Sequence, residues 1–526
     1  MLFKYLSDWA DTHTDKILVT QGSRTVTYGE VARSVMQIAT FFLKQGVRPG
    51  DRICIVLDNS PEYISSYIGV HRAGGIAVAV CPQYSPFEFR KIFNDCLPSA
   101  VIVDKKYVKH VLDAVSEGTS IQAIIIMEDS DVQSSSAARS GITSRHSNIR
   151  FYSVRDVINT PDCKIEYPVC NEKDVASIIY TSGTTGEPKG VMLSNENLMI
   201  NARSIIEYLQ LTEKDRIMGI LPFYYSYGTS LLTTHIIAGG SIVLENSFMY
   251  PNQVLDRMFA ESVTGFAGVP STFAILLNRS NIRKYTFPSL RYITQAGGAM
   301  SPLHAKEISE ILPGADIFIM YGQTEATARL TYLEPRDFHY RPWSIGKAIP
   351  GVDIELIKED GTIAKTGEVG EIVARGGNIM VGYWNRPEET DKVLKDGRLY
   401  TGDLAVRDEE GFLKIISRRS DIIKSGAHRI NPREIEEVIL ELPEVHEVAV
   451  AGKDDAILGM VIKACIVLKD GQGLDARKVQ RHCHNKLAPF KLPKEVVFVD
   501  ELPKTGTGKI RRHLINDLGA GIGSTG

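Results

Sequence analysis

The chain has no large excess of charge of either sign. Its 526 residues include 60 lysines and arginines and 63 aspartates and glutamates, which gives a formal net charge of −3 at pH 7. A basic field that would attract nucleic acid or an anionic membrane is therefore missing. Long apolar runs are missing too, because stretches such as Ile236 to Leu244 fall far short of the ~18 residues that a membrane-spanning helix needs. The N-terminal residues Met1 to Asp8 reach an acid before a hydrophobic segment develops. We therefore expect no secretory signal, no integral membrane association, no nucleic-acid partner and a cytoplasmic location.

Cysteine pairs with the spacing of a metal site are also absent. The seven cysteines are odd in number, and none of them forms a C-x-x-C pair, which argues for reduced thiols and against a disulfide or zinc framework. Only His482, Cys483 and His484 cluster like metal ligands. On a helix, side chains at successive positions point in different directions, so we interpret the three as ordinary surface residues.

What the chain does have is an ordinary globular composition, with 43% hydrophobic and 23% charged residues. Its length exceeds what one hydrophobic core organises, so we expect two or more domains. Up to about residue 168, β-branched runs such as Ile53 to Leu57 alternate with helical segments such as Tyr28 to Gln45. This pattern predicts an α/β fold with a largely parallel sheet. The polar, aperiodic segment 134–149 predicts an exposed loop or a disordered insertion.

One stretch stands out chemically. Residues 180–191 read YTSGTTGEPKGV and lie between two runs of strand type. Glycines let backbone N–H groups approach an anion, and the hydroxyls add donors, so the stretch suits a polyphosphate. It is not a P-loop, because Lys189 lies between Pro188 and Gly190 and a strand follows instead of a helix. By itself, the stretch could still be a plain surface loop.

Residues 180–191 resemble the signature loop of the AMP-forming adenylating superfamily, which holds acyl-CoA synthetases, adenylation domains of nonribosomal peptide synthesis and beetle luciferases. Members join a carboxylate to AMP from ATP and usually pass the acyl group to a thiol. Residues 317–325, IFIMYGQTE, resemble the family's second strong signature. The stretches 367–371, 382–384, 400–403 and 502–512 follow in the family's order, so the resemblance covers nearly the whole chain.

The resemblance implies a site for ATP and Mg²⁺. Glu325 would hold the metal, since a carboxylate is a hard oxygen ligand of the type that Mg²⁺ prefers. Asp403 would accept hydrogen bonds from both ribose hydroxyls, and Lys509 would be the catalytic lysine. With Glu325 and Lys509, Thr184 completes the catalytic set. The implied ATP-binding residues are Thr181, Ser182, Gly183, Thr184, Thr185, Gly186 and Lys189 in the signature loop, Gly297, Gly298 and Ala299 along the adenine, Tyr321, Gly322 and Thr324 after the second signature strand, and Asp403 and Arg418 at the ribose.

The resemblance also implies an open, mostly apolar slot for the carboxylic acid. Tyr225 would stand at the gate for the thiol, and Gly268 at the position where a bulky residue would close the floor. Ser226 replaces the aspartate that pairs with the ammonium group in members that activate amino acids. A free α-amino acid is therefore a poor candidate, because its ammonium would be desolvated without a counter-charge. The implied pocket residues are Tyr225, Ser226, Tyr227, Ser230, Gly268, Thr294, Ala296, Met320, Ala328 and Arg329.

Arg329 has two interpretations at this stage. It could bind a polar group of the substrate, or it could form a structural salt bridge, and we favour the salt bridge.

The fold implied by the resemblance is α/β, with a large N-terminal domain of mixed sheets and flanking helices and a small, mobile α+β C-terminal domain. We place the ATP and carboxylate sites in residues 1–419 and the catalytic Lys509 in residues 420–526. Helices are expected over 431–441 and 475–487, with strands over 447–451 and 461–468. A swing about Ser420 would bring a second face, with Lys424, Gly426 and Arg429, to the site for the thiol step. The family usually has Gly and Asp where this chain has Ser417 and Ser420.

Three functions fit this reading. The first is ATP-dependent activation of a fatty or aryl-type acid to acyl-AMP with release of pyrophosphate, followed by transfer to CoA. The second is a stand-alone adenylation enzyme that loads an acyl or peptidyl carrier protein, whose phosphopantetheinyl thiol would replace CoA. The third is an inactive nucleotide-binding protein, which the joint presence of Glu325, Asp403 and Lys509 disfavours.

Overall fold

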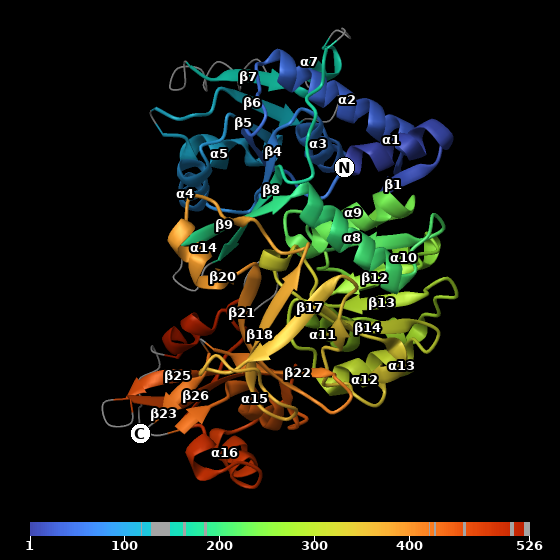
Figure 1. Ribbon diagram of the computed structural model, residues 1–526. Helices are drawn as coiled ribbons and strands as arrows, with labels where there is room; N and C mark the ends of the chain where they lie inside the picture. Colours follow the sequence, from blue (N-terminus) through green and yellow to red (C-terminus); the bar gives the residue numbers. More distant parts are fainter. Residues whose placement is uncertain are drawn as a thin grey trace.

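The computed structural model describes residues 1–116, 118–127, 148–160, 165–182, 187–419, 421–425, 428–455, 459–504 and 510–519. Two large sheets with covering helices form the N-terminal two thirds, a third sheet lies beside them, and the C-terminal elements lie beyond the second sheet (Figure 1). The predicted fold class, α/β with a large N-terminal part and a small C-terminal α+β part, is confirmed.

The first sheet has eight strands and is parallel through its centre, because each strand of the β3 to β7 region is followed by a helix or a long connection. In spatial order its strands are β19 (Gly382–Tyr383), β9 (Pro188–Ser194), β8 (Val175–Ser182), β4 (Ile76–Ala79), β3 (Arg52–Val56), β5 (Ala100–Asp104), β6 (Ala123–Met127) and β7 (Arg150–Ser153). Its helices are α2 (Tyr28–Lys44), α3 (Pro61–Arg72), α4 (Pro86–Cys96), α5 (Val108–Ala114) and α7 (Val154–Ile158).

The second sheet has nine strands and carries most of the predicted site. Its spatial order is β16 (Lys347–Ala348), β15 (Thr331–Leu333), β14 (Asp316–Tyr321), β13 (Tyr292–Gln295), β12 (Gly265–Gly268), β10 (Arg216–Gly219), β11 (Ser241–Leu244), β1 (Ile17–Gln21) and β2 (Arg24–Thr27). The accompanying helices are α1 (Leu2–Thr12), α8 (Asn195–Leu209), α9 (Ser226–Ala238), α10 (Pro251–Ala260), α11 (Pro270–Arg279), α12 (Pro302–Ile311) and α13 (Pro335–Phe338).

Helix α9 is an interior helix. Residues 228–236 are buried without a break, so this part of the helix has no face exposed to water, as expected for a helix surrounded by other elements. It packs against α8 and α1, and α8 and α9 lie between the two large sheets in Figure 1. Helix α8 starts at a capping box in which the Ser194 hydroxyl accepts from the Asn197 N–H.

The third sheet is antiparallel and contains β17 (Val352–Ile357), β18 (Gly370–Gly376), β21 (Arg398–Arg407), β20 (Leu394–Lys395) and β22 (Leu413–Arg418). Helix α14 (Pro387–Val393) precedes β20. Strand β21 carries Asp403, and its neighbour β22 carries Arg418 directly opposite.

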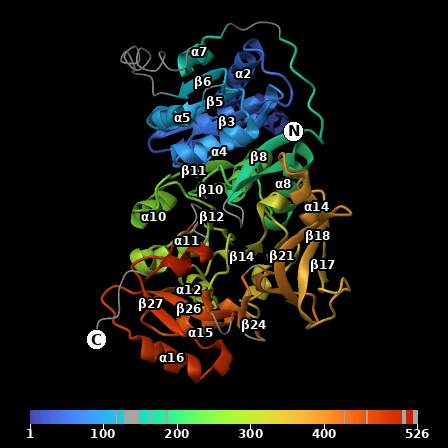
Figure 2. The ribbon, with the colours of Figure 1, turned by 90° about the vertical axis from the view of Figure 1, so that its left-hand side faces the viewer.

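The C-terminal elements form a small α+β unit beneath α11 and α12 (Figure 2). They comprise a hairpin, β23 (Ile423–Ser425) and β24 (His428–Ile430), and a three-stranded sheet, β25 (Val445–Asp455), β26 (Gly459–Leu468) and β27 (Glu495–Phe498), with α15 (Pro432–Leu440) and α16 (Ala476–His484). Strands β25 and β26 are antiparallel, whereas β26 and β27 are parallel across α16. The four expected elements are present, and the sequence analysis missed β27.

Two sequence expectations need comment here. Cys483 was predicted at the surface, which is wrong: it is fully buried in the C-terminal core, because α16 turns this one side chain inward while His484 stays exposed. The segment 134–149 lies almost wholly outside the described residues. No helix among the described residues is long and apolar enough to cross a membrane, and the cytoplasmic location stays a prediction.

Candidate active site

Three adjacent parallel strands of the second sheet bring the predicted residues to one edge. Strands β12, β13 and β14 pair in parallel and end at Gly268, Gln295 and Tyr321. Ligands of open α/β sheets bind outside the carboxyl ends of the strands, because the connecting loops gather there. The site is therefore built on loops that a rigid sheet holds in place.

The turn after β14 is fixed by close backbone packing. A Cβ at Gly322 would lie 2.0 Å from the Ala328 carbonyl oxygen, so only glycine fits there. The Leu330 N–H closes the turn on the Tyr321 carbonyl at 2.9 Å. Thr327 has φ of +63°, and its hydroxyl donates to the Asn378 carbonyl at 2.7 Å. These contacts hold Thr324 and Glu325 half-buried at the rim.

Glu325 is oriented by a tyrosine from another sheet. The Tyr383 hydroxyl on β19 donates to Glu325 Oε1 at 2.8 Å. Burial raises the pKa of Tyr383 far above its ordinary value, and the Glu325 charge adds to the shift. The phenol therefore stays a donor, and the second carboxylate oxygen remains available. Lys189 lies 5.2 Å from the centre of the Tyr383 ring and forms an ion pair with Glu389.

Asp403 lies at the centre of a second polar cluster and is only 4% exposed. The Tyr321 hydroxyl donates to its Oδ2 at 2.7 Å, and Arg418 Nε donates to its Oδ1 at 3.1 Å. The Asp403 charge raises the pKa of Arg418, while burial raises that of Tyr321 well above its usual range. An ionised carboxylate with two fixed donors keeps lone pairs for further hydroxyl groups.

The loop after β13 presents accessible backbone beside these residues. Gly297 has φ of +88°, in the left-handed region that favours glycine, and a Cβ there would meet Val269 Cγ1 at 3.0 Å. Gly298 and Ala299 are exposed. The Gln295 side-chain amide donates to the Gly298 carbonyl at 2.9 Å and fixes the loop. The resemblance predicts that the adenine lies along this loop, and this stays a prediction.

The residues predicted to line the acid slot are buried, and the open slot stays a prediction. Thr294, Ala296, Met320 and Ala328 are between 1% and 4% exposed. The Tyr227 hydroxyl donates to the Thr294 carbonyl at 3.0 Å, which joins two of the predicted lining residues.

The expected floor of the slot is closely packed. A Cβ at Gly268 would meet the Phe273 ring at 2.9 Å and Thr272 Cβ at 3.1 Å. A larger residue at Gly268 would thus collide with α11 before it reached the slot.

Residues at the start of α9 face the second signature. The Ser226 and Thr324 hydroxyl oxygens are 3.3 Å apart, and the Ser230 hydroxyl donates to the Tyr227 carbonyl at 2.6 Å. A cavity of about 10 Å³, room for roughly one water molecule, is lined by Ser226, Ser230 and Thr327 among others. Asn201 also lines it and has a buried Oδ1 without a partner among the described residues.

The C-terminal part reaches this site. Burial raises the pKa of Tyr84 to about 12, and the positive charge of Arg511 opposes that shift, as it does for the gate residue Tyr225. Burial lowers the pKa of Arg433 on α15, and Arg433 lies within the electrostatic reach of Asp403. Arg511, two positions after the predicted catalytic lysine, thus lies within electrostatic reach of Tyr225, and Arg433 lies within electrostatic reach of Asp403.

Arg329 does not form the salt bridge that the sequence analysis favoured. It is 2% exposed, and within the described ranges no carboxylate pairs with it. The reason is local: the side chain turns into a pocket of aromatic rings, where its guanidinium carbon lies 4.1 Å from the Tyr227 ring centre.

Several predicted site residues fall outside the described residues. These are Gly183, Thr184, Thr185, Gly186, Gly426, Lys509 and the hinge residue Ser420, together with the side chains of Ser182, Lys424 and Arg429. Thr181 pairs with Lys189 where β8 and β9 run antiparallel, which confirms that the signature loop connects two strands.

The described residues fit a nucleotide with magnesium. No group of three or more His, Cys, Asp or Glu side chains that could hold a metal occurs among them. One carboxylate, Glu325, suits a Mg²⁺ ion that takes its other ligands from phosphate and water.

Two models of known families match the chain. The model described as AMP-binding enzyme matches residues 6–384, and the model described as AMP-binding enzyme C-terminal domain matches residues 434–509. The chain belongs to the AMP-binding enzyme family. This AMP-binding enzyme is an AMP-forming ligase, as the resemblance implied.

Its relatives cover nearly its full length. The AMP-binding enzyme is 32% identical to the long-chain-fatty-acid–CoA ligase of Bacillus subtilis (strain 168), over 97% of this chain and 93% of that protein. A structure of the anthranilate CoA ligase AuaEII in complex with anthranoyl-AMP matches with a TM-score of 0.88 and 26% identity, over 98% and 96% of the chains. O-succinylbenzoate coenzyme A synthetase from Bacillus subtilis, in complex with ATP and magnesium ion, matches with a TM-score of 0.83 and 28% identity, over 98% and 99%.

The sequence analysis missed some residues of the site. Tyr383 lies in a stretch that was recognised, yet its bond to Glu325 spans 58 positions. Asn378 donates to the Arg329 and Ala326 carbonyls at 2.8 and 3.3 Å and holds the catalytic turn, and Arg433 lies near Asp403. Glycines around Asn378 were the only sequence signal for it.

Proposed function

We propose that this enzyme activates a fatty or aryl-type carboxylic acid to acyl-AMP with release of pyrophosphate and then transfers the acyl group to CoA. The observation that supports the proposal best is the meeting of Glu325, Asp403 and the Gly297–Ala299 backbone at one sheet edge. The relatives support it through their names, since a long-chain-fatty-acid–CoA ligase and an anthranilate CoA ligase bound to anthranoyl-AMP are among them.

Different residues of the chain would bind the nucleotide, bind the metal and stabilise charge in the first step. A carboxylate oxygen of the acid attacks the α-phosphorus of ATP, and the bond from that phosphorus to the pyrophosphate oxygen breaks. Asp403 would accept the ribose hydroxyls, and Tyr321 would lie against the adenine. Glu325, held by Tyr383, would bind Mg²⁺, which when bound neutralises phosphate charge. Lys509 and the donors of the signature loop would stabilise charge on the oxygens between acid and phosphate.

The second step needs a different arrangement of the C-terminal part. We infer two domains, residues 1–419 and 420–526. The second domain would swing about Ser420, so that Lys509 leaves the active site and the face with Lys424, Gly426 and Arg429 enters it. The positions of Arg433 and Arg511 near Asp403 and Tyr225 support an arrangement ready for the first step. CoA would then approach past Tyr225.

The test of this function is acid-dependent exchange of labelled pyrophosphate into ATP across fatty, aryl and α-amino acids. We expect fatty or aryl acids to exceed every α-amino acid, because Ser226 offers no charge to an ammonium. Thioester formation is then followed with CoA and, separately, with a phosphopantetheinyl carrier protein. An α-amino acid that outperforms all other acids would contradict the proposal. If the carrier protein is acylated and CoA is not, the acceptor is the carrier protein and not CoA.

Lys509→Ala separates the two steps. Acyl-AMP formation should fall by on the order of 10²-fold or more, as for other single charge-stabilising groups. Thioester formation from supplied acyl-AMP should survive, because the other face then meets the site. If both steps fell together in a folded variant, the swing would be wrong for this enzyme.

A further inference from the structure

Arg329 is a buried cation with neutral neighbours. It follows the turn after β14, two residues before β15, and is 2% exposed. Its Nη1 donates to the Ala328 carbonyl at 3.2 Å, and its Nε points to Met320 Sδ at 3.2 Å. The guanidinium stacks on Tyr227 at 4.1 Å and lies within hydrogen-bonding reach of the Tyr208 hydroxyl. None of these groups carries a negative charge.

The other buried lysine or arginine in the described part of the chain is paired. Lys463 is 1% exposed, and its Nζ lies 3.1 Å from a Glu495 carboxylate oxygen and donates to two backbone carbonyls. Arg329 differs from it, since among the described residues no aspartate or glutamate pairs with Arg329.

The contacts of Arg329 do not fully compensate for the cost of burying its charge. Taking an ion out of water into a protein interior is costly unless a partner compensates for the lost hydration. A cation–π contact returns only a part of that cost, and a carbonyl and a thioether are weaker partners than a carboxylate. A guanidinium presents five N–H donors in a fixed fork, and Ala328, Met320 and Tyr208 engage three of them. The remaining donors suit a carboxylate in a bidentate pair.

The residues around the Arg329 guanidinium indicate which molecule would supply that carboxylate. Arg329 contacts Met320, Ala328 and Tyr227, and all three belong to the predicted acid slot. Tyr227 in turn reaches the slot residue Thr294. Thr324 and Glu325, where the reacting carboxylate and the phosphates would lie, are at the opposite end of the turn, on the accessible rim. The guanidinium is thus more deeply buried than this rim and lies among the residues predicted to line the slot.

We propose that the acid activated by this enzyme carries a second carboxylate, and that Arg329 binds it while the first carboxylate reacts. The inference rests on the proposed function and narrows its substrate to dicarboxylic acids. Binding requires that Tyr227 and Arg329 move apart, because their side chains are stacked on each other. The aromatic contact then serves as the resting partner of the guanidinium when no diacid is bound.

The first experiment uses the wild-type enzyme and matched acids. Pyrophosphate release is measured with aliphatic and aryl dicarboxylic acids of increasing length, and with the monomethyl ester of each. The ester keeps one reactive carboxylate and nearly the same shape but loses the second charge. Removing one partner of a buried, hydrogen-bonded charge pair costs 2–5 kcal/mol, so we expect kcat/KM for the best diacid to exceed that for its ester by about 30-fold or more.

The second experiment changes the arginine. Arg329→Met should abolish the preference for the diacid over its ester while leaving the KM for ATP unchanged, and Arg329→Lys should keep part of the preference. The control is Arg336→Met, which removes a positive charge from an arginine whose side chain is 77% exposed on α13. This variant should keep the wild-type preference.

The outcomes separate this inference from the proposed function. Pyrophosphate release that is equal or faster with esters or other monocarboxylic acids would overturn the role of Arg329 and leave acid activation standing. No release with any acid would overturn both. If Arg329→Met lowered the rates with diacid and ester equally, Arg329 would be structural and the inference would be wrong. If that variant failed to fold, the wild-type ratio and Arg329→Lys would decide.

Discussion

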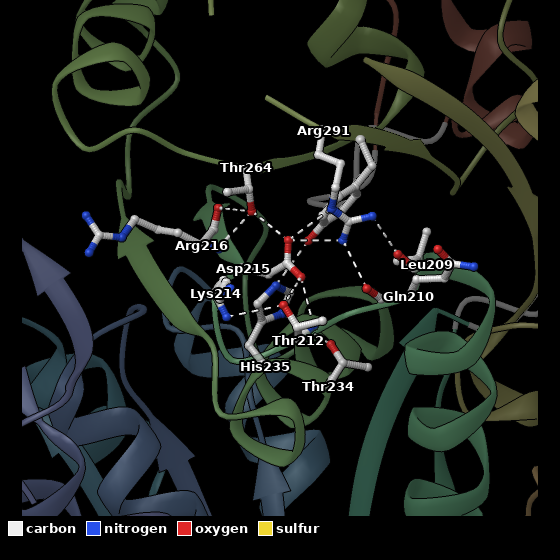
Figure 3. Close-up of polar contacts among 11 residues, drawn as sticks. Leu209, Gln210, Thr212, Lys214, Asp215, Arg216, Thr234, His235, Thr264 and Arg291 are labelled. Carbon is white, nitrogen blue, oxygen red and sulfur yellow. Dashed lines mark hydrogen bonds and ion pairs between the residues drawn. The ribbon is translucent and has the colours of Figure 1, made fainter. Parts of the chain in front are cut away.

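Two arginines at opposite ends of the same parallel strands have opposite surroundings. At the amino ends, Asp215 precedes β10, Thr264 precedes β12 and Arg291 precedes β13, and the three side chains meet (Figure 3). Arg291 Nη2 lies 3.0 Å from Asp215 Oδ1, and its Nη1 donates to the Leu209 carbonyl at 2.8 Å. The Arg291 side chain is 39% exposed and still has a carboxylate partner.

At the carboxyl ends, Arg329 is 2% exposed, and its partners among the described residues are neutral. The difference is the reverse of what stability alone would favour, since the deeper charge needs a counter-charge more. In the amino-end cluster the arginine has a carboxylate partner within the protein, and the cluster connects three strands. By our inference, Arg329 at the carboxyl end gains a carboxylate partner only when a ligand binds, as expected of a binding site. Variants at the two ends should therefore fail in different ways.

The largest effect is expected at Glu325. Glu325→Gln keeps an acceptor for the Tyr383 hydroxyl but removes the charge for the metal, so acyl-AMP formation should fall by about 10²–10³-fold. The unfolding free energy should change by less than about 1 kcal/mol, because Glu325 is half-buried and forms no ion pair in the described residues. Single-turnover assays and urea denaturation measure the two quantities. A stable variant with full activity would mean that Glu325 holds no metal.

Asp215→Asn should act in the opposite way. It removes the carboxylate that accepts from Thr212, Thr264 and Arg291. We expect the unfolding free energy to fall by about 2–3 kcal/mol, near the lower end for a broken buried pair because Arg291 can hydrate. Activity per folded molecule should not change. The control is Glu310→Gln, which breaks the exposed pair with Lys306 and should cost less than about 0.5 kcal/mol. Equal losses in both variants would show that the amino-end cluster has no special role.

His235 makes the amino end sensitive to acid. Its Nδ1 donates to the Leu231 carbonyl, its Nε2 accepts from the Tyr292 hydroxyl, and burial lowers its pKa to about 4. Between the ordinary value near 6.5 and pH 4, the unfolded chain takes up a proton that the folded chain refuses. Stability should thus be full above pH 6.5 and fall by about 3 kcal/mol as the pH drops to 4. His235→Gln should remove this part of the decline, measured as the difference between two denaturation series. Parallel curves would contradict the assignment.

The smallest effect concerns Gly268. Because a Cβ there would meet Phe273 and Thr272, Gly268→Ala should destabilise the protein by about 1–3 kcal/mol. Activity should fall to the same degree for acids of every length. A loss confined to long acids would show that Gly268 sets the depth of the slot after all.

The fold was predictable where the signals are local. Runs of β-branched residues locate β3 to β6, and turn residues separate them from helices such as α2, which ends one residue before the predicted limit. The C-terminal strand β27 escaped notice because Glu495–Phe498 is short and lies between prolines and charges. Cys483 could not be placed, because only the packing of α16 decides which of three neighbours turns inward.

The site was predictable as a set of motifs and not as a geometry. The second signature pointed to Glu325 and the stretch 400–403 to Asp403, but their partners Tyr383 and Tyr321 lie 58 and 82 positions away and meet them only in the folded chain. The resemblance implied an open slot with Gly268 at its floor. The sequence did not show that the Phe273 ring packs against Gly268 or that Tyr227 stacks on Arg329. Whether a carboxylate pairs with Arg329 depends on the tertiary structure, so no spacing in the sequence could show it.

The central claim is that acid activation takes place at the carboxyl ends of β12 to β14. It is tested most directly by acid-dependent pyrophosphate exchange in the wild type, Glu325→Gln and Asp215→Asn, each kept at a temperature at which it is folded. The account predicts exchange only when an acid is present, loss of that exchange in Glu325→Gln, and wild-type exchange per folded molecule in Asp215→Asn. Exchange that needs no acid, or that survives in Glu325→Gln and disappears in Asp215→Asn, would contradict it.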